Sequence, residues 1–203
     1  MPKIDLKKQL KHLYQPTAKE VAVVDVPEMN FLMIDGAGDP NTSQEYQEAI
    51  EALYAVAFTL KFMVKKQDPQ VDYVVPPLEG LWWAEEMDAF TMGDKDAWKW
   101  TAMIMQPEVV TQELVDEAVQ EVARKKDPAA LPKIRFEGYP EGLSVQIMHI
   151  GPYSEEAPTI EKLHAFAQQN GYQLRGKHHE IYVSDPRRTA PDRLKTVIRQ
   201  PVQ

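Results

Sequence analysis

The 203-residue chain contains no cysteine, which excludes disulfide bonds, thiolate metal sites and cysteine nucleophiles together. It has no apolar run near the roughly 18 residues that a membrane-spanning helix needs, so a transmembrane protein is excluded. Residues 1–15 are charged and lack the apolar core of a secretion signal. These absences predict a cytoplasmic protein, and the length is enough for a substantial hydrophobic core.

The chain also lacks an excess of basic residues. It has 23 Lys and Arg against 31 Asp and Glu, a formal net charge of -8. Proteins that bind nucleic acid carry a basic footprint, and here the basic residues are scattered along the chain. Nucleic acid and anionic membranes are therefore not expected as partners, and the balance better suits a cationic or neutral small molecule.

The aromatic residues are unevenly distributed, because all four tryptophans fall between Trp82 and Trp100. Such a group is either a core cluster or a binding surface. Glu79, Glu85 and Glu86 are interleaved with it, and acidic groups among aromatic rings favour the binding of a cation.

Hydrophobic periodicity predicts a mixture of helices and strands. A lead-in helix within 1–15 ends at Pro16, and residues 35–40 form a loop. Asn41, Thr42 or Ser43 caps a strongly apolar helix that ends near Lys66 and includes Phe58 and Phe62. Further helices are expected at 111–126, capped by Thr111, and at 156–169. Strands are expected at 29–34, 98–105, 144–150, 178–183 and 194–202, and residues 71–75 and 78–84 are either a strand pair or one strand broken at Pro76-Pro77.

The two halves of the chain resemble each other. Strand, glycine turn, helix, a strand with one glutamate, and a final strand occur twice in that order, and the final strands share Ile-x-Gln-Pro at 104–107 and 198–201. This order predicts a duplicated βαββ unit, with repeats at about 21–107 and 134–203 joined by the 111–126 helix. We expect a single α+β domain with a ligand cleft shared by the repeats.

The strand at 178–183 carries the main candidate for chemistry. Period-two alternation places Ile181 and Val183 on one face, expected to pack on the helices, and His178, Glu180 and Tyr182 on the other, expected to face the cleft. The alternative is a solvated sheet face. Glu79 takes the matching place in the first repeat. A carboxylate among aromatics suits either capture of a cation or general acid-base catalysis.

The turn Gly151-Pro152-Tyr153 holds a phenol directly after a strand, either as a packing residue or at the mouth of the cleft. His149, His178 and His179 match no metal-binding spacing, and the chain has no phosphate-binding glycine motif and no serine nucleophile elbow. The sequence therefore predicts neither a metal nor a cofactor.

Several motifs together resemble the GyrI-like small-molecule-binding family. They are His149-Ile-Gly-Pro-Tyr153, His179-Glu-Ile-Tyr182, Ser184-Asp-Pro186, and the closing strand with Gln200-Pro201. The first half, with Glu79-Gly-Leu-Trp-Trp83 and Trp98-Lys-Trp100, resembles a stand-alone branch of that family. The resemblance covers about residues 21–202 and implies two βαββ (SHS2-type) units with pseudo-twofold symmetry around a central ligand groove.

The resemblance also implies a function. Stand-alone members with Trp-rich grooves are similar to hydrolases that open cyclopropanoid electrophiles with water, a detoxifying reaction. Related domains bind multiple drugs or lipophilic cations without chemistry, and the family name also allows a protein-partner role. By position, Glu180 is the catalytic base and Tyr153 the assisting phenol. The implied ligand-binding residues are Glu79, Trp82, Trp83, Trp98, Trp100, Tyr139, His149, His178 and Tyr182, for an aromatic, lipophilic or cationic small molecule.

Overall fold

The computed structural model describes residues 4–84 and 95–203, which form two units. Unit 1 comprises residues 4–6, 29–78, 82–84 and 95–139, and unit 2 comprises residues 7–28, 79–81 and 140–203. Both combine helices with antiparallel strands, so the predicted α+β class is confirmed. Among these described residues, no helix is long and apolar enough to cross a membrane.

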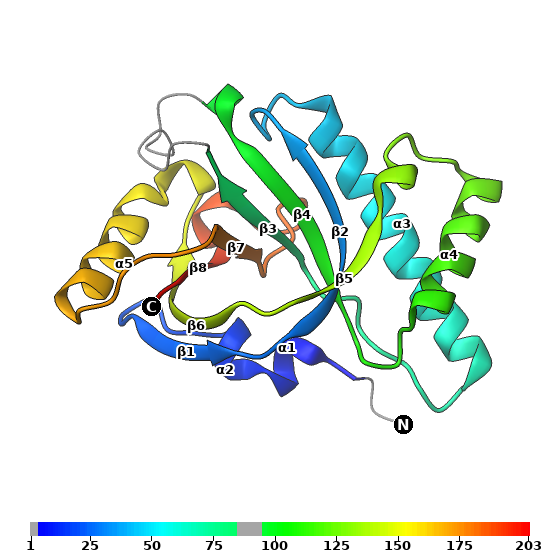
Figure 1. The fold of residues 1–203 in the computed structure, drawn as a ribbon, viewed down its shortest axis with the longest axis horizontal. Coiled ribbons are helices and arrows are strands. Elements are labelled where there is room, and N and C mark those ends of the chain that lie inside the picture. The colour runs from blue at the N-terminus through cyan, green and yellow to red at the C-terminus, as the bar shows by residue number, and fades with distance from the viewer. Residues whose placement is uncertain (1–3, 85–94) are drawn as a thin grey trace. The chain divides into compact units, whose positions relative to one another are not determined.

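Unit 1 is a sheet covered by a long helix (Figure 1). Strand β2 (Met29–Ala37) lies between β4 (Lys99–Gln106) and β5 (Arg135–Tyr139), and β3 (Leu78–Trp83) lies beyond β4. Helix α3 (Gln44–Gln67) packs on β2 and β4, and α4 (Gln112–Lys125) packs on α3. Short 3-10 turns occur at Lys95–Ala97 and Leu131–Lys133.

Hydroxyl side chains fix where the two helices of unit 1 begin. Ser43 Oγ accepts a hydrogen bond from the backbone N–H of Tyr46 at 3.2 Å, and Thr111 Oγ1 accepts one from Leu114 N–H at 3.3 Å. The first N–H groups of a helix have no partner within the helix, so such caps stabilise its start. The cap predicted at Thr111 is confirmed, and of the three candidates for α3 the structure has Ser43.

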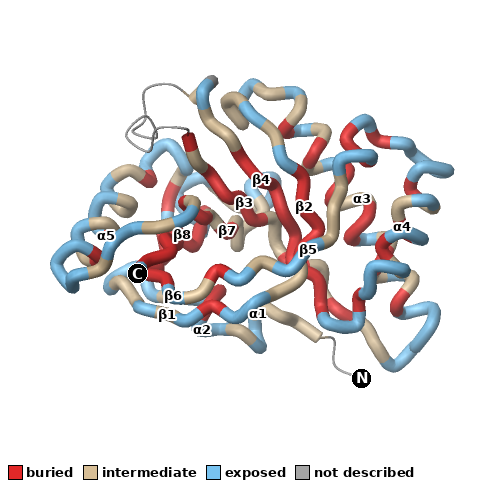
Figure 2. The backbone as a smooth tube through the Cα atoms, viewed as in Figure 1, coloured by how far each residue is buried: buried red, intermediate tan, exposed pale blue. Residues whose placement is uncertain are grey.

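In unit 2, four antiparallel strands are covered by a shorter helix. Its strands run in the order β1 (Ala22–Val26), β6 (Gly142–Ile150), β8 (Lys195–Pro201), β7 (His178–Tyr182). Helix α5 (Ala157–Gln169) packs on β6 and β8, where Leu163 and Ala167 bury Val145, Ile147 and Ile198. In Figure 2 the tube is red, that is buried, along most of β8. The short helices α1 (Leu6–Gln9) and α2 (Lys11–Tyr14) and the 3-10 turns Tyr153–Glu155 and Pro191–Arg193 complete the element list.

The duplication predicted from sequence is present in the topology. The order β2-α3-β3-β4 matches β6-α5-β7-β8, and in each set the last strand pairs antiparallel with the first. Each set is extended by a strand that directly precedes the other set in the sequence. Strand β1, which precedes β2, pairs with β6, and strand β5, which precedes β6, pairs with β2. The links are alike as well: Pro27-Glu28 joins β1 to β2, and Pro140-Glu141 joins β5 to β6.

Some predicted elements differ from the structure. Residues 71–75 form no strand, because only Tyr73 makes an isolated bridge, to Ile4. The predicted loop at 35–40 begins later, since β2 continues to Ala37 by pairing with Lys99. Strand β5 was not predicted at all, because Arg135–Tyr139 is short, polar and only partly buried. The predicted lead-in helix is broken at Leu10 into α1 and α2.

Candidate functional site

Glu180 lies at the centre of a polar cluster on β7. His178 Nε2 is 3.2 Å from Glu180 Oε1, and the Tyr182 hydroxyl donates a hydrogen bond to Glu180 Oε2 at 2.8 Å. The side chain of Glu180 is 15% exposed and that of His178 2%. A carboxylate oxygen accepts more than one hydrogen bond, so both oxygens retain acceptor capacity while the protein fixes their position.

This cluster faces the helix, which corrects the predicted orientation of β7. Residues directly opposite in an antiparallel pair point to the same face, and Glu180 is opposite Ile198, which packs against Leu163 of α5. The row of alternating polar residues therefore lies on the face that carries α5. The prediction that Ile181 packs on the helix is wrong, because Ile181 is opposite Val197 on the other face.

Two residues near the start and middle of α5 extend the cluster. Glu156 directly precedes the helix, is 5% exposed, and forms a side-chain hydrogen bond with Glu180. Burial opposes ionisation of Glu180, but its hydrogen bond and attraction to His178, with bonds to Tyr182 and Glu156, outweigh burial and lower the Glu180 pKa. Burial also lowers the pKa of His164, and nearby His178 lowers it further. Glu180 is consequently an ionised acceptor at neutral pH.

Tyr153 borders this cluster on the turn between β6 and α5. Its ring stands edge-on to that of Tyr182 at a centroid distance of 5.5 Å, and the residue is 39% exposed. His149 braces the turn, with Nδ1 3.0 Å from Thr159 Oγ1 and Nε2 3.3 Å from the Pro152 carbonyl oxygen. His149 is thus a buried residue of β6 that holds the turn, and the Tyr182 phenol contacts the Glu180 carboxylate.

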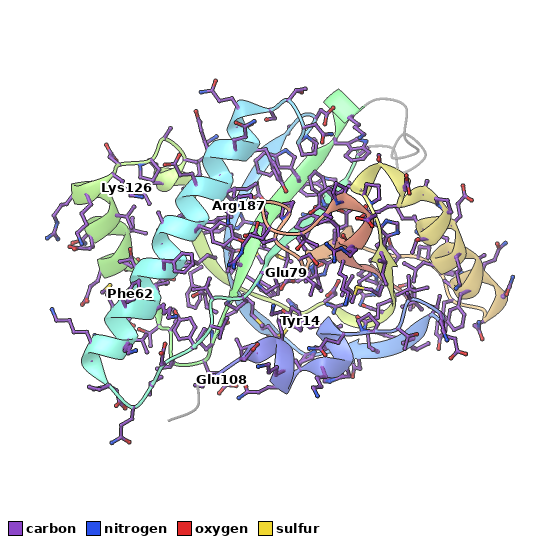
Figure 3. All side chains as sticks on the ribbon, turned by 180° about the vertical axis from the view of Figure 1, so that it is seen from behind. Tyr14, Phe62, Glu79, Glu108, Lys126 and Arg187 are labelled. Carbon is purple, nitrogen blue, oxygen red and sulfur yellow. The ribbon has the colours of Figure 1, made fainter. Side chains whose placement is uncertain are left out.

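The opposite face of the unit 2 sheet holds a second, fully buried polar group, which we call the ion network: Tyr14, Glu79, Glu141, His179 and Arg199. Tyr14 donates to Glu79 Oε1 at 2.7 Å, and His179 Nε2 lies 2.9 Å from Glu79 Oε2. His179 Nδ1 lies 2.8 Å from Glu141 Oε1, and Arg199 Nη1 donates to Glu141 Oε2 at 2.9 Å. Figure 3 labels Tyr14 and Glu79.

Charge attraction and hydrogen bonds outweigh the effect of burial at His179 and Glu141. Burial by itself would lower the pKa of His179, but attraction to Glu141 and hydrogen bonds to Glu141 and Glu79 raise it to about 9. Burial would raise the pKa of Glu141, but His179 and Arg199 lower it to about 2. A charged imidazole donates from both nitrogens, which matches two carboxylate partners. Glu79, predicted to face a ligand, is 0% exposed with both oxygens engaged.

The tryptophans belong mainly to the core of unit 1. Trp82 and Trp100 are 3% and 0% exposed, and both contact Tyr46 of α3, at centroid distances of 5.6 and 4.9 Å. Trp98 stands edge-on to Trp82 at 5.9 Å and lies under the Lys95 ammonium at 5.5 Å. Trp98 and Trp83 are partly exposed, whereas Trp82 and Trp100 have almost no surface open to a ligand.

Three further predictions concern other positions. Tyr139, on β5, is half-buried and packs edge-on against Phe31 at 6.4 Å. Glu85 and Glu86 lie outside the described residues. Within the described ranges, no group of three or more His, Cys, Asp or Glu side chains is arranged to hold a metal ion.

Sequence reasoning missed Glu156, His164, Tyr14, Glu141 and Arg199. Glu156 had a usable signal, because it directly precedes a helix that follows the Gly-Pro-Tyr turn. Tyr14, Glu141 and Arg199 had none, since they are far apart in the sequence and come together only through the fold.

Comparisons with known proteins agree with this architecture. The model of the GyrI-like small molecule binding domain matches residues 19–203. An uncharacterized conserved protein from Listeria innocua is 44% identical with a TM-score of 0.92, covering 99% of this chain and 100% of its own. Two proteins of Listeria innocua described as hydrolases are 40% and 42% identical, with TM-scores of 0.85 and 0.88, covering 99% and 100% of this chain and 100% of theirs.

No curated protein matches the chain. The C-terminal domain of EcmrR shares the fold at 15% identity, with a TM-score of 0.56 over 91% of this chain and 97% of that domain. The family match covers most of the chain, including the Glu180 cluster and four of the five members of the ion network. The protein therefore belongs to the GyrI-like small-molecule-binding domain family.

Proposed function

We propose that this protein is a detoxifying hydrolase that opens cyclopropanoid electrophiles by addition of water, with Glu180 as the base. The observation that carries the proposal is a fixed, ionised and partly exposed carboxylate on β7, held by His178 and Tyr182. Two whole-chain relatives described as hydrolases support the reaction class. The lack of cysteine favours a cytoplasmic location for such an enzyme.

In this mechanism a water molecule donates a hydrogen bond to Glu180 and attacks a carbon of the strained ring. The new carbon–oxygen bond forms as a ring carbon–carbon bond breaks, and the released electron pair is taken up by the conjugated scaffold. Glu180 accepts the proton of the water, and that proton is then returned to the scaffold. The strained ring supplies much of the driving force, so one positioned base and orientation suffice.

The neighbours of Glu180 have distinct roles in this proposal. Tyr182 and His178 hold the carboxylate in one orientation, and Tyr153, the more exposed phenol, positions the water or the ligand. Trp82 and Trp100 are buried core residues of unit 1, so their role is structural.

The test is a Glu180→Gln variant assayed with a cyclopropanoid alkylating compound. We expect unchanged binding of the compound and a loss of ring opening of at least about 100-fold, because a general base contributes typically 10²–10⁴-fold. Glu117→Gln, an exposed residue of α4, is the matched control and retains full activity. Product chromatography reports ring opening directly, and equal turnover by the Glu180 variant refutes the mechanism.

A second candidate function is binding of lipophilic cations without chemistry. It is favoured by the same ionised carboxylate beside the rings of Tyr182 and Tyr153, which together provide counter-charge and aromatic contact. Titration with a fluorescent aromatic cation, followed by chromatography of the recovered ligand, distinguishes the two. For this function Glu180→Gln weakens binding, whereas for the hydrolase it leaves binding of a neutral substrate unchanged.

A further inference from the structure

Helix α3 carries an aromatic stripe on its outer side. The inner side of the helix consists of buried residues, among them Leu53, Leu60 and Val64, which pack in the core of unit 1. Phe58 and Phe62, which are among the residues that make this helix strongly apolar in sequence, are 46% and 63% exposed. Among the described residues Phe62 is the most exposed large hydrophobic side chain, and it is labelled in Figure 3.

The stripe extends over four turns along one helix face. Tyr54 stacks on Phe58 at a centroid distance of 6.2 Å, and Glu51 and Lys65 lie seven residues to either side of Phe58. Residues seven apart on a helix differ by about 20° in direction, so all of these side chains share the outer face. From Glu51 to Lys65 the stripe is about 21 Å long at 1.5 Å per residue.

The charges along this face are ordered. Glu48 and Glu51 lie toward its N-terminal end, whereas Lys65 and Lys66 lie toward its C-terminal end; Glu48 is half-buried and the other three are exposed. Lys65 also pairs with Asp72 at 3.1 Å while its side chain remains 49% exposed. A second copy of the helix in the parallel direction would place like charges together, whereas an antiparallel copy would place opposite charges together.

We propose that the outer face of α3 is a homodimer interface in which two copies pair antiparallel about a twofold axis through Phe58. In that register residue i meets residue 116 minus i of the other copy. Phe58 then faces its own copy, Tyr54 faces Phe62, and Glu51 faces Lys65. A twofold interface must be complementary to itself, and this helix face meets that condition, with aromatic residues at its centre and oppositely charged residues at its two ends.

The proposed interface is small. One helix pair of this length buries less than the roughly 1,200–2,000 Å² of a standard stable interface, so we expect association in the micromolar range. Helix α4 also packs on α3 but leaves Phe58 and Phe62 exposed, so it does not occupy this face. The proposal is independent of the Glu180 chemistry.

The absence of cysteine permits a direct test of the axis. Phe58→Cys introduces a single thiol that meets its own copy only if the twofold axis passes through position 58. We expect rapid disulfide dimerisation of this variant under mild oxidation. Val109→Cys, another exposed apolar position of unit 1, is the control and should remain monomeric. Equal crosslinking at both positions, or none at position 58, overturns the proposed axis.

Sedimentation equilibrium of the cysteine-free chain tests the association itself. We expect a monomer–dimer equilibrium that Phe62→Asp weakens at least about tenfold, since a charge replaces a buried apolar contact. Glu51→Lys should weaken it as well, and adding Lys65→Glu should restore it by exchanging the paired charges. Circular dichroism checks that each variant is folded. A wild-type chain that stays monomeric at several hundred micromolar, or a Glu51→Lys variant that dimerises normally, overturns the proposal.

Discussion

Replacing Arg199 with methionine is the sharpest test of the ion network. Arg199 is 0% exposed, and its guanidinium donates to Gln146 Oε1 at 2.9 Å, to Glu141 Oε2 at 2.9 Å and to the Leu13 carbonyl oxygen at 2.8 Å. Methionine fills much of the volume but donates no hydrogen bond. The substitution leaves a buried carboxylate with one cationic partner in place of two, along with two unpaired acceptors.

Removing one member of a buried ion pair costs about 3–5 kcal/mol. For a chain of 150–250 residues each kcal/mol lowers the melting temperature by roughly 2–4 °C, so we expect a decrease of about 10 °C. Urea unfolding followed by circular dichroism measures the free energy, and Arg188→Met, an exposed position in the 183–194 connection, is the control. Adding Glu141→Gln removes the uncompensated charge and should recover part of the loss. If Arg199→Met lowers the free energy of unfolding by less than about 1 kcal/mol, the network contributes no more than a surface ion pair, and this reasoning is refuted.

Three further predictions follow from the same structure. The pKa of His179 is raised to about 9, so its stabilising contribution is complete below pH 6.5 and is lost as the pH rises through 9. The pKa of Glu141 is lowered to about 2, so its contribution is complete above pH 4.5 and is lost as the pH falls through 2. Urea midpoints measured from pH 2 to 10 should therefore peak between 4.5 and 6.5. Gly36→Ala should destabilise unit 1 by about 1–3 kcal/mol, because the added Cβ would lie 2.3 Å from the Trp100 ring, and tryptophan fluorescence should shift with it. Ser43→Ala should cost about 1 kcal/mol in thermal unfolding by removing the cap of α3, whereas Thr42→Ala should cost much less.

The local elements were largely predictable because their signals are local. Hydroxyl caps, helical periodicity and the Ile-x-Gln-Pro repeat each depend on residues within a few positions of one another. They identified α3, α4, α5 and most strands, and the order of those elements indicated the duplication. Glu180, His178 and Tyr182 were grouped correctly because alternation along one strand is also local.

Which side of each strand or helix is buried, and against which neighbour, depended on the tertiary structure. Alternation grouped Ile181 apart from Glu180 but did not determine which group faces α5, because that depends on the pairing of β7 with β8. Phe58 and Phe62 belong to the apolar residues that predicted α3, yet they lie on its exposed side, opposite Leu53 and Leu60. The pairing of β1 with β6 and of β5 with β2 could not be predicted from local patterns either, because the two strands of each pair are far apart in the sequence.

The sequence alone therefore determined the element types, the repeated order and the family motifs, because backbone preference and side-chain period act over a few residues. Only the tertiary structure brought Tyr14, Glu79, Glu141, His179 and Arg199 into one buried network. Charged side chains can be buried only where opposite charges arrive from other segments to replace the water they lose. That compensation is a property of the folded chain and of no single segment within it.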